Sequence, residues 1–190
     1  MADKTRKFRS FKNKKQINRR TVHRGNETHQ LFKVYFTQLN LGKRVAAMTN
    51  LAQRTSNSHF ISFLQEPHVV TSRGQSKITG LDSQHSTYQV NDPHCRAAIY
   101  AHRELPMWMN HELSDKDNTS CLWVTKDIGM GRVLLVSSYW DRFVLNPPQK
   151  LIQALEYAKT NNFQVLVGAD TNAHSTMTGS ERTDSRGKFL

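Results

Sequence analysis

Short apolar runs separated by polar segments dominate the chain after its first thirty residues. Their length of five to nine residues favours strands over helices, and most are bounded by glycine, proline or polar residues. The runs extend over residues 31–39, 59–65, 97–101, 121–125, 132–138 and 163–168. The last of them, which ends at Gly168, is predicted to be a buried strand because it is almost continuously apolar.

Two segments instead repeat apolar residues at helical spacing. One covers residues 43–54, and the other follows Asn146, which is the expected N-cap with Pro147 at the first helical position. The polar segment 69–93 is predicted to be a long surface loop. Strands alternating with helices predict an α/β fold for residues 31–190.

Composition and charge divide the chain into an arm and one domain. The protein has 190 residues, 37% of them hydrophobic, which suffices for one sizeable core. Residues 1–30 hold ten Lys or Arg and only two acidic residues, so they carry +8 of the formal charge of +12. Because almost no aliphatic residue interrupts this segment, it is predicted to be a disordered basic arm.

The arm has two interpretations, which the sequence leaves about evenly matched. The first is functional, in which the arm binds nucleic-acid phosphates or acts as a nuclear-import signal. The second is a tail that only keeps the protein in solution. The candidate nucleic-acid-binding residues are Lys12, Lys14, Lys15, Arg19 and Arg20.

Cysteines and histidines give no sign of a disulfide or a zinc centre. Cys95 and Cys121 lack CxxC spacing, which predicts reduced, buried thiols in an intracellular protein. Cys95 and the histidines at 85, 94, 102 and 111 lack the spacing of zinc ligand pairs, so no zinc site is predicted. No apolar stretch near 18 residues occurs, so neither a membrane span nor a secretory signal is expected.

Polar residues follow several of the predicted strands at the point where each strand ends. Asn40, Glu66, Tyr139 and Asp170 occupy such positions, and in layered α/β folds the carboxyl ends of strands bring distant residues together. Each taken alone is equally typical of a turn or a strand terminator. The four together predict a site.

Asp170, Asn172 and His174 follow one another at alternate positions. An extended chain at this point would turn all three side chains to one side. The alternative is a polar turn in which Asp170 and Asn172 bond only to the local backbone.

An ordered set of motifs resembles one known superfamily. Residues 38–40 (Gln-Leu-Asn), 64–67 (Leu-Gln-Glu-Pro), 137–139 (Ser-Ser-Tyr), 168–174 (Gly-Ala-Asp-Thr-Asn-Ala-His) and 184–187 (Asp-Ser-Arg-Gly) carry the likeness. The chain is similar in them to the endonuclease/exonuclease/phosphatase superfamily, and within it to the apurinic-type endonuclease domain of non-LTR retrotransposons. The resemblance covers residues 31–190 and implies a four-layer α/β sandwich, in which helices flank two mixed sheets.

The resemblance also implies a role for each matching residue. Glu66 would bind a divalent metal with help from Asn40, and hard oxygen donors of this kind suit Mg²⁺ or Mn²⁺. Asp170 would orient or deprotonate the attacking water. Asn172 would hydrogen-bond a phosphate oxygen, and Tyr139 would line the phosphate pocket.

The resemblance leaves the role of His174 open. His174 recurs in the family's motif, and a role in packing or in orienting its neighbours is as consistent with the resemblance as a role in proton transfer. The family closes with a downstream Asp and a terminal Ser-Asp-His motif, which this sequence does not contain. The chain is therefore expected to be a domain truncated at its C-terminus, with lost or reduced activity.

The function implied is Mg²⁺-dependent nicking of DNA by a nuclear, monomeric domain that needs neither a membrane nor a small-molecule cofactor. Two alternatives stay open at this point. One is a nucleic-acid-binding remnant without catalysis. The other, less favoured by the basic arm, is a phosphomonoesterase acting on a lipid or nucleotide phosphate.

Overall fold

The computed structural model describes residues 34–55, 59–80, 82–125, 131–176 and 179–189. The predicted basic arm 1–30, with its five candidate phosphate-binding residues, lies outside the described residues. Within the described residues, the elements are, in chain order, β1 (Val34–Asn40), α1 (Val45–Thr55), β2 (His59–Gln65), β3 (Val69–Ser72), β4 (Gln75–Ile78), β5 (His85–Tyr88), β6 (Ala97–His102), β7 (Met107–Met109), β8 (Asn118–Thr125), β9 (Gly131–Tyr139), α2 (Gln149–Thr160), β10 (Gln164–Asp170) and the 3-10 turn η2 (Gly187–Phe189).

Two mixed four-stranded sheets form the body of the protein. The first sheet has the order β1-β2-β6-β5 and the second β10-β9-β8-β7, while β3 and β4 form a separate hairpin. In each sheet one pair is parallel: β1 with β2, and β10 with β9. The α/β class predicted from the sequence is confirmed.

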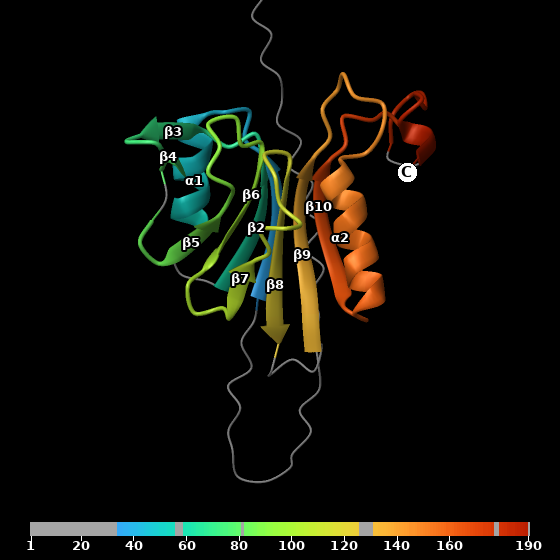
Figure 1. The fold of residues 1–190 in the computed structure, drawn as a ribbon. Coiled ribbons are helices and arrows are strands. Elements are labelled where there is room, and N and C mark those ends of the chain that lie inside the picture. The colour runs from blue at the N-terminus through green and yellow to red at the C-terminus, as the bar shows by residue number, and fades with distance from the viewer. Residues whose placement is uncertain (1–33, 56–58, 81, 126–130, 177–178, 190) are drawn as a thin grey trace, which may run out of the picture.

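The apolar side chains form three clusters that fix how these elements pack. The first lies between the two sheets and includes Ile61 and Ile99 from one sheet and Cys121 and Leu135 from the other. In the second, α1 packs on the outer face of the first sheet. In the third, α2 packs on the outer face of the second sheet. Figure 1 shows the two sheets side by side, with α1 on the left and α2 on the right.

The positions of several elements correct the sequence predictions. The segment 69–93 is not a single loop, because it contains β3, β4 and β5. These are four-residue strands without a continuous apolar run, so hydrophobic patterning does not detect them. The second helix begins at Gln149, and Pro148 rather than Asn146 occupies its N-cap position, without a side-chain capping bond. Pro148 disfavours helical backbone at the residue before it, which delays the helix start.

The strand β10 is exposed, although its apolar run predicts burial. Val165, Leu166 and Val167 are 37%, 37% and 40% exposed. The reason is position: β10 pairs with β9 on one side and forms the edge of its sheet among the described strands. Composition cannot distinguish an edge strand from a central one when both are apolar. Neither helix of the described part is long and apolar enough to cross a membrane.

Candidate functional site

The carboxyl ends of the two parallel strand pairs meet across the sandwich. In register, Asn40 lies opposite Gln65, and Asp170 lies opposite Tyr139. The Asn40 side-chain amide donates to Asp170 Oδ2 at 2.5 Å, although the two residues are 130 positions apart. The structure thus brings Asn40 and Asp170 together, one from each sheet.

A buried polar network holds the two sheets together just below this contact. Gln65 Nε2 donates to Ser137 Oγ at 3.1 Å and to the carbonyl of Gly168 at 3.0 Å. Ser137 Oγ in turn donates to the carbonyl of Leu64 at 3.0 Å. A Cβ added to Gly168 would lie 2.3 Å from Phe63 Cβ, so this close approach requires glycine. The network fixes the spacing of the strand ends that carry the site.

Glu66 follows β2 in an unusual backbone conformation. Its φ of 48° is left-handed, which costs a non-glycine residue about 1–2 kcal/mol. Two backbone hydrogen bonds hold it there: its N–H donates to the carbonyl of Arg96 at 2.8 Å, and its carbonyl accepts from the N–H of Lys43 at 2.7 Å. Strain of this kind gathers at functional sites, where the surrounding structure enforces it.

Tyr139 is buried at the point where the acidic side chains converge. Burial raises the pKa of its phenol, and the negative charge of Glu66 raises it further; a hydrogen bond with Asn172 and the Arg96 cation act in the opposite direction. Asp170 adds a smaller upward contribution to the same pKa. Glu66, Asn172 and Asp170 therefore all lie within electrostatic reach of one phenol, which stays neutral as a hydrogen-bond donor.

The chain turns at Asn172, so the extended geometry predicted for this segment is wrong. Asn172 has a φ of 46°, and its N–H donates to Asp170 Oδ1 at 3.1 Å in a local turn. Its side-chain amide donates to the carbonyl of Trp140 at 2.9 Å. Asparagine tolerates the left-handed region better than most residues, which favours a turn over extended backbone here.

His174 is held through its main chain rather than through its ring. Its N–H donates to Asp184 Oδ2 at 3.1 Å, and its carbonyl accepts from the N–H of Asp184 at 2.9 Å. The pKa of Asp184 is lowered, first by the N–H of Gly187. The His174 side chain is exposed, and no contact in the described part of the chain brings it to Asp170 or Glu66. Its orienting role stays a prediction.

The motif at 184–187 shapes the turn after Asp170. A Cβ on Gly187 would lie 1.9 Å from the carbonyl oxygen of His174, so only glycine fits. Arg186 is buried, and its Nη1 lies 3.5 Å from the carbonyls of Thr171 and Asn172. Its guanidinium also lies 5.6 Å from the centre of the Trp140 ring.

Sequence patterning does not detect the contribution of Arg96. Its guanidinium lies 4.9 Å from the centre of the Tyr139 ring and pairs with Asp117 at 2.6 Å and with Asp141. These partners lie in loops 21 and 45 residues away in the sequence, so no local motif predicts the two ion pairs. Two aspartates match the charge of Arg96, which leaves it little attraction for other anions.

The donor set at the strand ends fits a hard divalent cation. Among the described residues, neither Glu66 nor Asp170 makes a salt bridge. Asn40 Oδ1 accepts one bond, from the N–H of Gly42 at 2.9 Å, and an amide oxygen has a second lone pair. Carboxylate and carboxamide oxygens without softer ligands suit Mg²⁺ or Mn²⁺.

A basic pocket opens beside Glu66. It has a volume of about 340 Å³, and its charged lining residues are Lys43, Lys116 and the Arg96–Asp141 ion pair, so Lys43 and Lys116 supply its excess positive charge. Two of its lining residues, Pro67 and His68, follow Glu66 directly in the sequence, so the pocket begins next to the strand-end cluster. Cationic side chains in such a groove are suited to phosphate groups.

Neither a family model nor a curated protein matches the chain. Among solved structures, the chain is similar to the endonuclease domain of TRAS1, a telomere-specific non-LTR retrotransposon, with a TM-score of 0.59 and 22% sequence identity. The match covers 80% of this chain and spans 65% of the length of that domain. The resemblance found in the sequence motifs is therefore confirmed at the level of the fold.

Proposed function

We propose that this chain, with the fold of a retrotransposon endonuclease domain, hydrolyses phosphodiester bonds in DNA using a divalent cation, Mg²⁺ or Mn²⁺. The observation that carries the proposal is the contact of Asn40 with Asp170 across the two sheets, beside Glu66 and Tyr139. Carboxylates from two sheets that pair with no cationic side chain among the described residues are arranged for metal-assisted hydrolysis rather than for packing.

The described side chains support a division of roles. Glu66 and the Asn40 oxygen would hold the cation, which would supply charge neutralisation at the phosphate oxygens. Asp170 would accept a proton from the attacking water. The hydrogen bonds to its two oxygens, from Asn40 and from the N–H of Asn172, orient the carboxylate for this task.

Two further side chains would bind the phosphate. The neutral Tyr139 phenol has a proton to donate to a non-bridging oxygen. The Asn172 amide donates one N–H to the carbonyl of Trp140, and its other N–H, which contacts the Tyr139 phenol, would turn to the phosphate. Donors fixed in this way stabilise charge that develops in the transition state.

The basic pocket and the arm would bind the rest of the nucleic acid. Lys43 and Lys116 would neutralise phosphates next to the scissile one, and the five basic residues of the arm would add contacts that lack sequence preference. Such a protein would act in the nucleus, and we propose that the two sheets and their outer helices are part of the four-layer sandwich.

A second function is favoured by one observation. The pocket lined by Lys43 and Lys116 offers cationic side chains to nucleic-acid phosphates, whether or not the chain cleaves them. This observation supports nucleic-acid binding as a function in its own right. The phosphomonoesterase alternative has no comparable support.

Nicking of supercoiled plasmid tests the proposal. The 190-residue chain is incubated in molar excess over the plasmid in Mg²⁺ or Mn²⁺, beside EDTA and Glu66→Gln, which is isosteric but uncharged. Slow nicking that requires the metal and Glu66 is the expected result. Nicking that survives in Glu66→Gln would refute the proposed site, and DNA binding without any nicking would favour the second function.

A further inference from the structure

The opposite end of the first sheet carries a second cluster of metal-binding side chains. His59 begins β2, His102 ends β6, and Glu104 lies two residues beyond His102. Glu66 follows His59 by seven positions along β2, which corresponds to roughly 20 Å of extended strand. This cluster is therefore distinct from the strand-end site proposed for catalysis.

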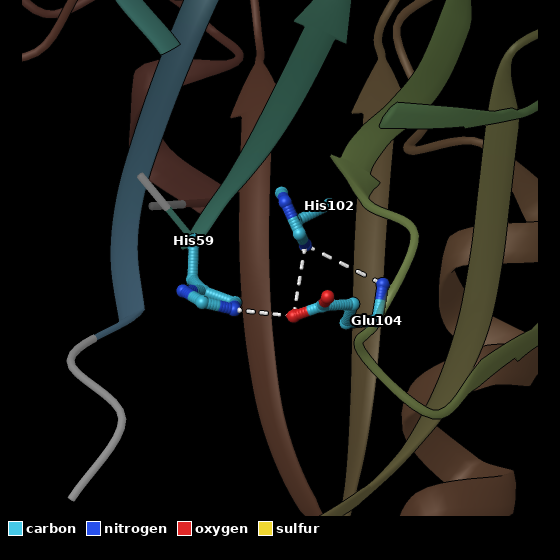
Figure 2. Close-up of side chains that lie close together, drawn as sticks. All are labelled: His59, His102 and Glu104. Atoms are coloured by element: carbon cyan, nitrogen blue, oxygen red, sulfur yellow. Dashed lines mark hydrogen bonds and ion pairs between the residues drawn. The ribbon is translucent and has the colours of Figure 1, made fainter. Parts of the chain in front are cut away.

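The three side chains converge on one small volume. His59 Nε2 lies 3.1 Å from Glu104 Oε2, and His102 Nδ1 lies 3.9 Å from the same oxygen. All three ligand atoms lie within 4.8 Å of one another. Figure 2 shows the Glu104 carboxylate reaching between the two imidazoles.

These distances are close to those that a tetrahedral ion requires. Zinc binds histidine nitrogen and carboxylate oxygen at about 2.0–2.2 Å, so neighbouring donors around it stand roughly 3.3 Å apart. The observed separations of 3.1 and 3.9 Å lie on either side of that value. Small rotations of exposed Glu104 would bring the donors into place.

His102 is half-buried, and its ring packs against two other imidazoles. Its Nδ1 accepts only a long contact, 3.4 Å, from the N–H of Glu104. The ring lies 4.5 Å from the His59 ring and 5.2 Å from the His85 ring, measured between centroids, which restricts its orientation.

His85 supplies a second, independent observation beside the cluster. Its side chain is fully buried, and its Nδ1 bonds to Asp82 at 2.8 Å. Its Nε2 is buried without a hydrogen-bond partner among the described residues. Unpaired buried polar atoms are costly, and they gather where an ion or a water completes the structure.

We propose that His59, His102 and Glu104 bind a Zn²⁺ ion, separate from the cation at the strand ends. Two imidazoles and one carboxylate leave a fourth position to water, and nitrogen donors select zinc over Mg²⁺. The ion would tie the start of β2 to the end of β6, the two central strands of the first sheet.

Zinc titration against a chromogenic chelator tests this site without relying on activity. The wild-type chain is compared with Glu104→Ala, which alters a side chain that is 70% exposed and so should leave the fold intact. The variant is expected to lose one zinc equivalent, with affinity lowered by roughly 100-fold, and His102→Asn should do the same. Cobalt in place of zinc should give a tetrahedral visible absorption that Glu104→Ala removes.

Matched variants separate this site from the other histidines and from the catalytic proposal. Glu112→Ala and His111→Asn change exposed residues elsewhere and should bind zinc like the wild type. Glu66→Gln should also bind zinc normally, so failure of the nicking proposal would not affect this result. Equal zinc binding by the wild type and Glu104→Ala would overturn the proposal and leave His59 and Glu104 as an ion pair only.

Discussion

The two ends of the first sheet carry clusters of opposite character. At the carboxyl end, the donors are oxygens, they come from both sheets, and Glu66 and Asn172 have left-handed backbone. At the other end, two of three donors are imidazoles from one sheet, and the third is a carboxylate in the turn after β6. None of His59, His102 and Glu104 is among the described residues with positive φ.

On the two proposals, the fold would separate two kinds of cation site. Hard oxygen donors from the two sheets meet where β2 and β10 end. Glu66 is strained at this end, and its hydrogen bonds to Arg96 and Lys43 maintain its backbone conformation. The histidine cluster requires only two neighbouring antiparallel strands and a turn, so it forms without strain.

The largest expected effect is a loss of nicking activity when the carboxyl-end cluster is changed, but not when the histidine cluster is changed. Asn40→Ala removes the hydrogen bond that orients Asp170 across the sheets, and nicking should fall by about 100-fold. Glu104→Ala should leave the nicking rate unchanged, because it lies at the other end. Single-turnover plasmid assays on the two variants measure both, and an equal loss in both would erase the distinction.

The turn after Asp170 should be sensitive to a single methyl group. Gly187→Ala places a Cβ against the carbonyl oxygen of His174, so the backbone must move and the free energy of unfolding should fall by about 2 kcal/mol. Lys188→Ala, at the exposed neighbouring position, is the control. Urea denaturation compares them, and an unchanged midpoint in Gly187→Ala would show that this contact is not tight.

Strain at Glu66 should appear as a gain of stability when it is relieved. Glu66→Gly permits the left-handed backbone, and the free energy of unfolding should rise by up to about 1 kcal/mol, although the proposed metal ligand is lost. Glu104→Gly lacks this benefit and should not stabilise the protein. If both glycine variants are destabilised equally, strain does not distinguish the two ends.

The smallest expected effect is a change in the pH dependence of the protein's stability. The N–H of Phe143, and then Arg96, lower the pKa of Asp141 below its ordinary value of 3.8. The ionised carboxylate therefore stabilises the folded state above that value, and the contribution is lost as the pH falls through the folded pKa. The stability difference between wild type and Asp141→Asn should shrink from pH 7 to pH 3. A constant difference would contradict this assignment.

Sequence patterning predicted the α/β class and the strands that carry the site. It did so because β2 and β9 are apolar runs whose length and bounding polar residues identify them without tertiary context. It failed for β5 and for the exposure of β10, because pairing and edge position depend on distant strands. The same limit applies to Arg96 and to the pairing of His59 with His102, since each depends on contacts between separate segments.

The strand-end residues show what motif resemblance adds and where it stops. Asn40 and Asp170 were placed at one site from motifs 130 residues apart, and the structure joins them by a hydrogen bond. The expected extended path to His174 was wrong, because residue spacing does not reveal the left-handed turn at Asn172.

Manganese binding tests the central claim most directly. Electron paramagnetic resonance measures free Mn²⁺ during titration of the wild type, Glu66→Gln and Glu104→Ala, each with zinc present. The account predicts one Mn²⁺ site that Glu66→Gln abolishes and Glu104→Ala leaves intact. Unchanged Mn²⁺ binding in Glu66→Gln, or its loss in Glu104→Ala, would contradict the assignment of the hard cation to the carboxyl ends of the strands.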